Sequence, residues 1–561
     1  MAILIGKWLN SVSIKWFIMV LWAFICVLLF YRTYNRYKYE PRFYYVHQML
    51  GSSLCISRGS AAVINLNCGL VLLPMCRVVV TSLRGILRKM SMYTMRVIID
   101  SCKGFHIACA YAIVLSSVIH YTAHVINARN FSMNYNRIYT NVNAAKYQYE
   151  DPLWIILGTV SGTTGIMMMF ILCLVVTTSL KYIRDNNYDL FWFSHRLIVL
   201  MYILLMVHAF RGPIRMQLNI KYHTPGCKFR NLSFPWPEPE FYHAFKSYSC
   251  DEEPQFGEIG CQSYLWVTAP ILLYIGDVVY RIRRRSTSAH IIQTVLHDDV
   301  IELKMVKDGL TAHAGQYVLL QFPAISVFEW HPYSLTSCPK KGSAFTVHIR
   351  SRGDWSGRLR KLIEDCQEES HYINEEADNI ARTQKVKVNL DGPFSSPMED
   401  MSTYRLLLCI AGGIGITPFA SFLDAFRTNK KQQWKFRRIY LIWINKNIQN
   451  IRWFGELIHS LHEELWESNL PDIFDVRFHF TEISKNLCDD LPVSYREYVR
   501  KRLTYGRPDW KELFNEIVAS HSTHRVGVFA CGPKQLTKNV KKQCWRKYSN
   551  KTTFDFHEEI F

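Results

Sequence analysis

The stretch GFHIACAYAIVLSSVIHYTAHV, residues 104–125, is an apolar run long enough to cross a membrane, and it carries His106 and His120 14 residues apart. A second apolar run carries His195 and His208, 13 residues apart. At 1.5 Å of rise per residue, each interval spans about 20 Å, roughly two thirds of a hydrocarbon core. Ionisable side chains at that depth are rare and usually functional, so the spacing predicts two stacked haem irons, each held by two imidazoles. Such haems have no open axial position, so they pass electrons and do not bind a gas at the metal.

The ligand set has alternatives. Fourteen residues of straight helix return a side chain to within about 40° of its starting face, whereas thirteen leave it about 140° away, so the second pair predicts a distorted helix. His124, 18 residues after His106 and on the same face, is an alternative ligand. A lone helical histidine is more often structural, and it is the two matched pairs that favour haem.

Long apolar runs of the kind that can cross a membrane fill only the first half of this 561-residue chain, and none follows Tyr280. We expect six membrane helices, at residues 14–31, 60–81, 105–126, 153–180, 190–210 and 263–280. The remaining half is long enough for two domains with separate cores. The predicted fold is an α-helical membrane bundle over residues 1–286, an antiparallel β-barrel over 287–398 and a parallel α/β domain over 399–561.

Basic residues predict the orientation in the membrane and account for the net charge of +20. They cluster between the second and third runs, at Arg77, Arg84, Arg88, Lys89, Arg96 and Lys103, and after the sixth, at Arg281, Arg283, Arg284 and Arg285. The positive-inside rule therefore puts both termini in the cytosol, although Arg32, Arg36, Lys38 and Arg42 fall on the outer side. At membrane edges this charge favours anionic lipid headgroups over nucleic acid as a partner.

The predicted outer loop, residues 212–262, holds the only three cysteines expected in an oxidising compartment, Cys227, Cys250 and Cys261. On the same side Asn130 and Asn231 begin Asn-X-Ser triplets and are predicted glycosylation acceptors, whereas Asn550 falls in the cytosol and should be silent.

Beyond the membrane runs the pattern changes twice. Short alternating runs at residues 300–306, 317–322, 345–349 and 386–390 are typical of a small antiparallel barrel. After Tyr404, apolar strands at 406–410, 439–444 and 526–529 alternate with helical stretches at 454–466 and 510–518. That alternation predicts a parallel α/β nucleotide-binding domain.

Two loops at strand ends carry the nucleotide prediction. The first, AGGIGITP over 411–418, offers Gly412, Gly413 and Gly415 for a close approach to pyrophosphate, with Thr417 as helix cap and Pro418 in the first turn. The second, Cys531-Gly532-Pro533, follows another apolar strand. A single glycine-rich turn often only closes a connection, but two at strand carboxyl ends indicate a nucleotide site.

Two barrel segments supply the aromatic, hydroxyl and guanidinium groups that a flavin needs. They are His331-Pro332-Tyr333-Ser334 and His348-Ile349-Arg350, the latter followed by Trp355 and Ser356. Taken alone, an ordinary strand with a surface arginine and a core tryptophan explains them better.

In order and separation, HPYSLTS (331–337), HIRSRGDWS (348–356), DGPF (391–394), AGGIGITPF (411–419), FACGP (529–533) and the terminal Phe561 resemble the NADPH oxidase family. The resemblance covers nearly the whole chain. It implies FAD, NADPH and two b-type haems, with His106 and His195 on the inner haem and His120 and His208 on the outer one. It also implies that Phe561 covers the flavin until nicotinamide displaces it.

Further segments, SRGSAAVINLNC (57–68), LLPMCR (72–77), NAAKYQYEDP (143–152), HTPGC (223–227) and YGRPDW (505–510), are similar to a constitutively active, peroxide-releasing branch of that family. The chain departs from the family pattern at Tyr333-Ser334, at Ser395 and at Lys446, which stands where an arginine is typical. An ammonium cannot form the planar fork of a guanidinium, so Arg507 is the better candidate for the 2′-phosphate of NADPH.

The resemblance implies electron transfer from cytosolic NADPH through FAD and the haems to oxygen on the far side, giving superoxide, hydrogen peroxide or both. Arg58 and His124 are expected at the oxygen site, although Arg58 pairing with a haem propionate is an equal alternative. His223 is expected to donate a proton near neutral pH, and Cys227 with Cys250 to staple the outer loop as a cover. By the same resemblance we expect a small membrane-anchored partner subunit and residence in the endoplasmic reticulum or plasma membrane. The competing functions are a ferric-chelate reductase and a non-enzymatic proton channel or scaffold subunit.

Overall fold

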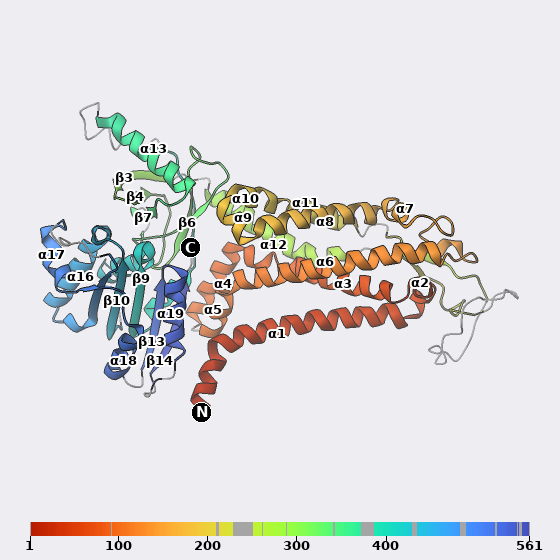
Figure 1. Ribbon diagram of the computed structural model, residues 1–561, viewed down its shortest axis with the longest axis horizontal. Helices are drawn as coiled ribbons and strands as arrows, with labels where there is room; N and C mark the ends of the chain where they lie inside the picture. Colours follow the sequence, from red (N-terminus) through yellow and green to blue (C-terminus); the bar gives the residue numbers. More distant parts are fainter. Residues whose placement is uncertain are drawn as a thin grey trace. The chain divides into compact units, whose positions relative to one another are not determined.

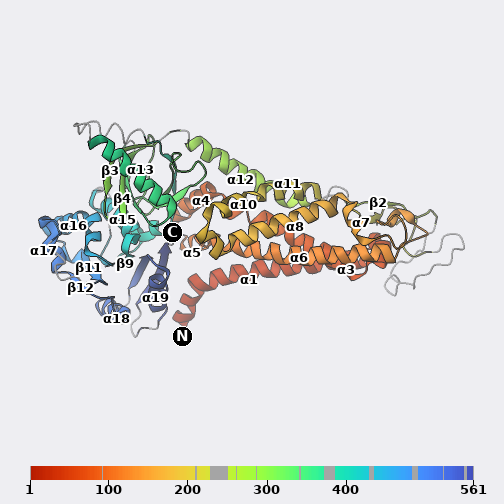
Figure 2. The same ribbon diagram turned by 45° about the horizontal axis from the view of Figure 1, so that its top comes forward.

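The computed structural model describes residues 2–90, 92–208, 212–227, 251–260, 262–285, 287, 289–339, 343–371, 386–428, 435–482, 490–521, 524–546, 548 and 552–559. It divides into two compact units, the first Met1–Val79 with Leu87–Val278 and the second Val80–Ile86 with Val279–Phe561. Figures 1 and 2 show long helices running alongside one another in the first unit.

Six segments of the described chain are long and apolar enough to cross a membrane, as expected: Ile14–Tyr39, Ser52–Met75, Cys102–Met133, Val160–Ser179, Tyr188–His208 and Ser263–Arg285. They lie in helices α1 (Ala2–Tyr39), α3 (Ser52–Leu70), α6 (Cys102–Met133), α8 (Val160–Ser179), α10 (Tyr188–Arg196), α11 (Ile198–His208) and α12 (Ser263–Arg285). Shorter elements complete the unit: α2 (Tyr44–Leu50), α4 (Arg77–Lys89), α5 (Tyr93–Ile99), α7 (Pro152–Leu157), α9 (Lys181–Asn186) and an antiparallel pair, β1 (Arg215–Gln217) and β2 (Phe256–Glu258).

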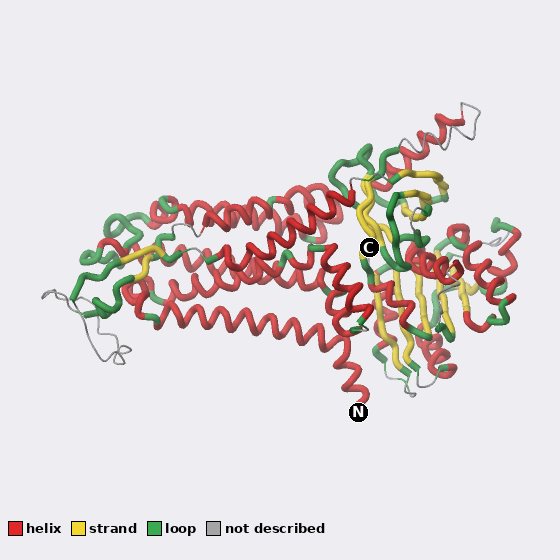
Figure 3. Tube along the Cα trace, turned by 180° about the vertical axis from the view of Figure 1, so that it is seen from behind, coloured by secondary structure: helices red, strands yellow, loops and turns green. Residues whose placement is uncertain are grey.

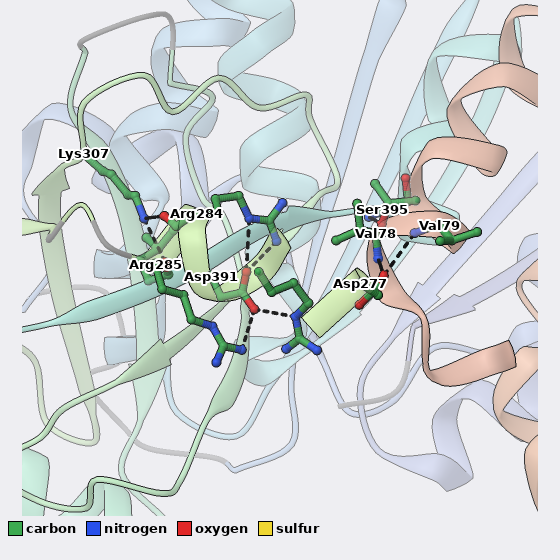
Figure 4. Close-up of polar contacts among 11 residues, drawn as sticks. Val78, Val79, Asp277, Arg284, Arg285, Lys307, Asp391 and Ser395 are labelled. Carbon is green, nitrogen blue, oxygen red and sulfur yellow. Dashed lines mark hydrogen bonds and ion pairs between the residues drawn. The ribbon is translucent and has the colours of Figure 1, made fainter. Parts of the chain in front are cut away.

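The second span begins earlier and ends earlier than the predicted 60–81. Its first turns are rich in serine, which lowers hydropathy, but Ser53, Ser57 and Ser60 each donate to a backbone carbonyl one turn back, so these three hydroxyls are paired within the helix. After Met75 the basic helix α4 begins. Its first turn is fixed by Asp277 of α12, whose Oδ1 accepts the Val78 and Val79 N–H groups at 2.8 and 3.3 Å (Figure 4).

The distortion predicted for the fifth span is confirmed. Instead of one straight helix, α10 ends at Arg196 and α11 begins at Ile198, with a turn at Leu197. The break changes the angular relation of His195 and His208, which straight helical spacing would put on nearly opposite faces.

In the second unit, an antiparallel barrel is built from two three-stranded sheets. One has the order β3 (His290–Leu296), β4 (Val300–Val306), β7 (Phe345–Arg350), and the other β6 (His331–Ser334), β5 (Tyr317–Gln321), β8 (Asn389–Phe394). Single bridges between Ala289 and Val388 and between Leu335 and Val347 join further backbone around them. Inward side chains such as Ile301, Leu303 and Val347 form the barrel core, beside helix α13 (Asp354–His371).

The rest of the second unit is a six-stranded, fully parallel sheet, as predicted, in the order β12 (Leu503–Tyr505), β11 (Phe474–Phe480), β10 (Arg438–Asn445), β9 (Leu406–Gly412), β13 (Arg525–Cys531), β14 (Thr553–Glu559). Helices cover both faces (Figure 3): α15 (Thr417–Thr428), α16 (Gly455–Glu467), α17 (Val493–Arg500), α18 (Trp510–Ser520) and α19 (Lys534–Cys544). The β9 side chains alternate between the two resulting cores, Leu407 in one and Leu408 in the other. Between β9 and β13 the strand order reverses, which is where open α/β sheets bind ligands.

Candidate functional site

The four membrane histidines form two facing pairs. The ring centroids of His106 and His195 are 6.4 Å apart, and those of His120 and His208 are 6.2 Å apart. Metal–imidazole bonds are about 2 Å long and a ring centroid lies roughly 1 Å behind its nitrogen, so two imidazoles on one iron should have centroids about 6 to 6.5 Å apart. Both separations fit a bis-imidazole haem. His124 packs 4.5 Å from the His120 ring, and it is His120 that faces His208.

Three of the four rings are held by a contact at Nδ1. His106 Nδ1 lies 2.9 Å from the Val71 carbonyl oxygen and His120 Nδ1 lies 2.8 Å from that of Ser57, so both nitrogens donate and both Nε2 atoms keep their lone pairs. His208 Nδ1 lies 3.0 Å from the Thr164 hydroxyl oxygen, whose own proton goes to Val160. Ligand histidines in metalloproteins are oriented in this way.

A cavity of about 540 Å³ in the first unit is lined by His120, His124, His208 and Arg58, so the structure brings the expected oxygen-site residues together. Gly162 and Gly165 of α8 also line it, and a Cβ added at Gly165 would lie 3.3 Å from His208 Cε1. The Arg58 guanidinium lies over the Tyr37 ring at 5.1 Å. Two basic residues that line the same cavity, Arg32 and Arg36, were not predicted as site residues. Their position on the outer side, against the positive-inside rule, was the signal that could have identified them.

His223 is fully buried, although it lies in the predicted outer loop. Its Nδ1 donates to the Glu252 carbonyl oxygen at 2.9 Å, and its Nε2 accepts from the Tyr45 hydroxyl at 2.6 Å. Burial lowers the pKa of His223 below its ordinary value and outweighs the opposing hydrogen bond and the Glu253 carboxylate. The ring is therefore neutral at pH 7, so an imidazolium donor near neutral pH is disfavoured.

Cys227 is disulfide-bonded, but Cys250, Cys261 and Asn231 lie outside the described residues, as does Asn550, so the Cys227–Cys250 pairing stays a prediction. Asn130 lies within α6, where its Nδ2 donates to the Leu50 carbonyl oxygen at 3.0 Å. The same nitrogen lies 3.4 Å from Ser53 Oγ, and a glycan would replace one of its two hydrogens and so remove one of these contacts, which argues against the acceptor predicted there.

The second unit contains a cavity of about 630 Å³ that collects most of the predicted flavin and nucleotide residues. Those lining it are Pro332, Tyr333, Ser334, His348, Arg350, Gly412, Gly413, Gly415, Thr417, Lys446, Arg507, Cys531, Gly532 and Pro533. Those not lining it are His331, Ile349, Trp355, Ser356 and Pro418, and Phe561 lies outside the described residues. Missed lining residues include Asn445, Thr481 and Glu559. Since they end or follow β10, β11 and β14, the rule of ligands at strand carboxyl ends was the signal for them.

Several of the predicted residues outside the cavity support its wall. The ring centroids of His331 and Trp355 lie 4.1 Å apart, and the Tyr333 ring stacks on that of Trp355 at 6.2 Å. The Ser356 hydroxyl accepts the Arg352 and Gly353 N–H groups at 3.0 and 3.1 Å. Ser334 Oγ is buried and has no hydrogen-bond partner within the described part of the chain, so it is available to a ligand.

The two strand-end loops touch, and only glycine allows this. A Cβ at Gly412 would lie 2.8 Å from Pro533 Cδ, and one at Gly415 would overlap the Cys531 carbonyl oxygen. Gly413 has a φ of 56° and lies beside the Arg350 guanidinium. Thr417 has helical dihedral angles and is the first residue of α15, so the prediction that it caps the helix is wrong.

At the rim, Lys446 Nζ is paired with Glu482 Oε1 at 2.5 Å, whereas Arg507 is exposed on the same cavity. Arg507 has the planar guanidinium group that suits a phosphate, and it is not the partner of Glu482. Both facts favour Arg507 over Lys446 as the phosphate ligand.

Asp391 of the DGPF motif is fully buried and receives three guanidinium groups from the end of α12 (Figure 4). Arg281, Arg284 and Arg285 lie 2.8, 2.5 and 2.7 Å from its oxygens. Burial raises the pKa of Asp391, but the three cations outweigh it and hold the pKa below the ordinary value. Nearby, Lys307 Nζ donates to the Arg284 and Leu390 carbonyl oxygens at 3.0 and 2.9 Å.

Family models match three parts of the chain: a ferric reductase like transmembrane component over residues 58–206, an FAD-binding domain over 286–398 and a ferric reductase NAD binding domain over 404–545. NADPH oxidase 4 of Mus musculus and of Homo sapiens are each 38% identical over 584 aligned residues that cover 100% of both chains. NADPH oxidase 1 of Rattus norvegicus is 30% identical, with 99% of this chain and 100% of that protein covered.

Proposed function

The chain belongs to the NADPH oxidase family, and from this premise we propose which of its residues carry each part of the reaction. It is an integral, multi-pass membrane oxidoreductase that uses NADPH and oxygen and produces reactive oxygen species. FAD and two b-type haems, when bound, supply hydride acceptance and one-electron transfer across the bilayer.

His106 with His195 holds one haem iron and His120 with His208 holds the other, each through Nε2. The observation that carries this assignment is the pair of centroid separations, 6.4 and 6.2 Å, together with the Nδ1 contacts of His106, His120 and His208. Since those contacts fix the ring orientations before a metal arrives, little reorganisation is needed on haem binding.

Oxygen is reduced in the cavity beside His120 and His208. Arg58 supplies a fixed positive charge there, which favours superoxide as its negative charge develops. Arg32 and Arg36 line the same cavity, so one cation can pair with a haem propionate while another faces oxygen. His124 contacts the His120 ring and excludes water from that side.

On the NADPH side, the strand-end glycines bring backbone N–H groups to the pyrophosphate, Arg507 and Lys446 bind the 2′-phosphate, and Tyr333, Ser334 and Arg350 bind the flavin. That Phe561 covers the flavin in the absence of nicotinamide stays a prediction, because Phe561 lies outside the described residues.

Hydrogen peroxide is released when the first product is retained and protonated under the outer loop. The ends of that loop, at Pro213 and Ile259, line the oxygen cavity. His223 holds the loop to Tyr45 of α2 and takes part in proton transfer as a neutral imidazole that accepts from the Tyr45 hydroxyl, and not as an imidazolium donor. Both termini face the cytosol. The protein resides in the endoplasmic reticulum or plasma membrane and assembles with a small membrane-anchored subunit.

A reduced-minus-oxidised spectrum and NADPH-driven oxygen uptake, measured on the same membranes, test the proposal. We expect a b-type haem band and oxygen uptake that exceeds ferric-chelate reduction. Faster reduction of the ferric chelate would instead identify a ferric reductase, and membranes without the band would indicate a channel or scaffold.

A further inference from the structure

A second cluster of potential metal ligands lies on the outer face of the barrel, and two of its three members, His297 and Glu302, take part in no step above. Glu302 on β4 and His348 on β7 are direct register partners, and His297 lies in the turn between β3 and β4. Since alternate residues of a strand share a face, Glu302 and His348 point away from the core that Ile301, Leu303 and Val347 form. One histidine from the turn joins them on that face.

The ligand atoms of these three side chains all lie within 4.8 Å of one another. His297 Nε2 is 3.4 Å from Glu302 Oε2, and His348 Nε2 is 3.6 Å from the same oxygen. In a tetrahedral zinc site with bonds of about 2.0 to 2.1 Å, neighbouring ligand atoms are about 3.3 Å apart. Shifts of a few tenths of an ångström would therefore bring both contacts to coordination geometry.

His348 is prepared to ligate. His348 is 5% exposed, and among the described residues its buried Nε2 has no hydrogen-bond partner, with Glu302 Oε2 the acidic oxygen near it at 3.6 Å. Its Nδ1 lies 3.1 Å from the Thr336 hydroxyl oxygen, and in the tautomer that carries the proton on Nδ1 the Nε2 lone pair faces the cluster. Phe454 packs on the ring at 4.4 Å and restricts its rotation. A buried nitrogen without a partner is costly, and a metal ion would satisfy it.

We propose that His297, Glu302 and His348 bind one Zn²⁺ ion, with water in the fourth position, and that the ion slows flavin reduction. Two imidazoles and one carboxylate suit zinc and disfavour Mg²⁺ and Ca²⁺, which prefer oxygen ligands. The Glu302 side chain is 29% exposed, which provides an entry path. His348 also lines the 630 Å³ cavity, so zinc would fix part of the wall against which flavin and nicotinamide are placed.

Zinc binding is tested on the purified full-length protein, with its thiols alkylated, by competition with a chromophoric zinc chelator. Wild-type protein should bind one zinc ion. The zinc affinity of His297→Asn and of Glu302→Gln should be at least about 10-fold lower. The matched control His313→Asn, which replaces an exposed histidine of the same barrel, should bind it normally. Equal binding by all four proteins would overturn the site. This readout does not depend on oxidase activity, so it can succeed or fail separately from the proposed function.

The regulatory effect is tested by stopped-flow reduction of the bound flavin by NADPH. Zinc should slow this step in the wild type and in His313→Asn, reversibly on addition of a chelator. Zinc should not slow flavin reduction in His297→Asn. Without zinc, the rate of flavin reduction in this variant should match the wild type, because His297 does not line the cavity. Zinc bound at the cluster without any change in rate would overturn the inhibitory role.

Discussion

The haem-binding assignment depends on individual nitrogen atoms. Replacing His120 by Ala removes one axial ligand and leaves His208 facing an empty position. We expect haem content, measured as the pyridine haemochrome, to fall from two per chain to about one, with oxygen uptake abolished because electron transfer across the bilayer is interrupted.

Thr164→Val is the matched control, since it removes only the hydroxyl that contacts His208 Nδ1. It should retain both haems but bind the outer one about 10-fold to 100-fold more weakly. Full haem content in His120→Ala would contradict the assignment.

NADPH preference also depends on single charges. Glu482 pairs with Lys446 at 2.5 Å and competes with the 2′-phosphate for its ammonium group. Glu482→Gln should therefore lower the KM for NADPH, whereas Arg507→Ala should raise it about 10-fold, the equivalent of one charge-assisted hydrogen bond. Neither change should alter the KM for NADH, which lacks that phosphate. Equal shifts for both nucleotides would exclude a 2′-phosphate role.

At the scale of helices and strands, periodicity predicted most of the soluble elements. The strand expected at 300–306 is β4, and the helix expected at 510–518 is α18. The strand expected at 386–390 is instead β8 at Asn389–Phe394, because it contains Gly392 and Pro393, residues depleted in strands. Its position is set by pairing with β5 and by the ion pairs of Asp391, which are long-range contacts that local patterns do not contain.

The candidate site was predictable to a similar extent. Glycine and histidine motifs identified much of each cavity because their chemistry is visible in the sequence. Arg32 and Arg36 were missed because their roles depend on which helices surround the cavity. The burial of His223 was missed because the hydrophobic cluster of α2, which includes Tyr45, is assembled from distant segments.

The contact between the two strand-end loops leads to a third prediction. Gly415→Ala would push the first loop away from the Cys531 carbonyl, so the KM for NADPH should rise and the melting temperature, followed by flavin fluorescence, should fall. The control Gly357→Ala lies in α13 with nothing within 4 Å of an added Cβ, so it should leave both values unchanged or raise the stability slightly. A Gly415→Ala protein with normal nucleotide binding would show that the loops need not touch.

At the scale of the whole molecule, basic residues that the sequence assigns to lipid headgroups form internal ion pairs. Arg84 of α4 is 2% exposed and pairs with Asp400 at 3.2 Å, and Asp391 pairs with three of the four arginines at the end of α12. The sequence pattern could not distinguish these uses, because a basic helix end looks the same whether its partner is a phosphate or a carboxylate.

The crowding of cations around Asp391 predicts how stability depends on pH. Burial, followed by repulsion from Arg284, lowers the pKa of Lys307 from 10.5 to about 8. Between these values the unfolded chain binds more protons than the folded one, so the free energy of unfolding of this unit should rise as pH increases from about 8 toward 10.5. Chemical denaturation followed by flavin fluorescence on either side of pH 8 should show the rise, and Lys307→Met should abolish it. The Asp391 pKa is lowered, so its contribution is present at these pH values and is lost only in acid.

Asp391 holds the end of α12 within the second unit, because the final arginines of this helix bind its carboxylate. Asp391→Asn would leave three partly buried guanidinium groups without their counter-ion, and removing one partner of a buried ion pair costs about 3–5 kcal/mol. We expect a lower unfolding midpoint and reduced oxygen uptake, with flavin reduction by NADPH less affected because Asp391 does not line the nucleotide cavity. Asp298→Asn, which removes an exposed carboxylate of the same barrel, should behave as wild type. If Asp391→Asn lost flavin reduction and oxygen uptake in equal proportion, the ion pairs would support only the fold of the barrel and not its attachment to the membrane helix.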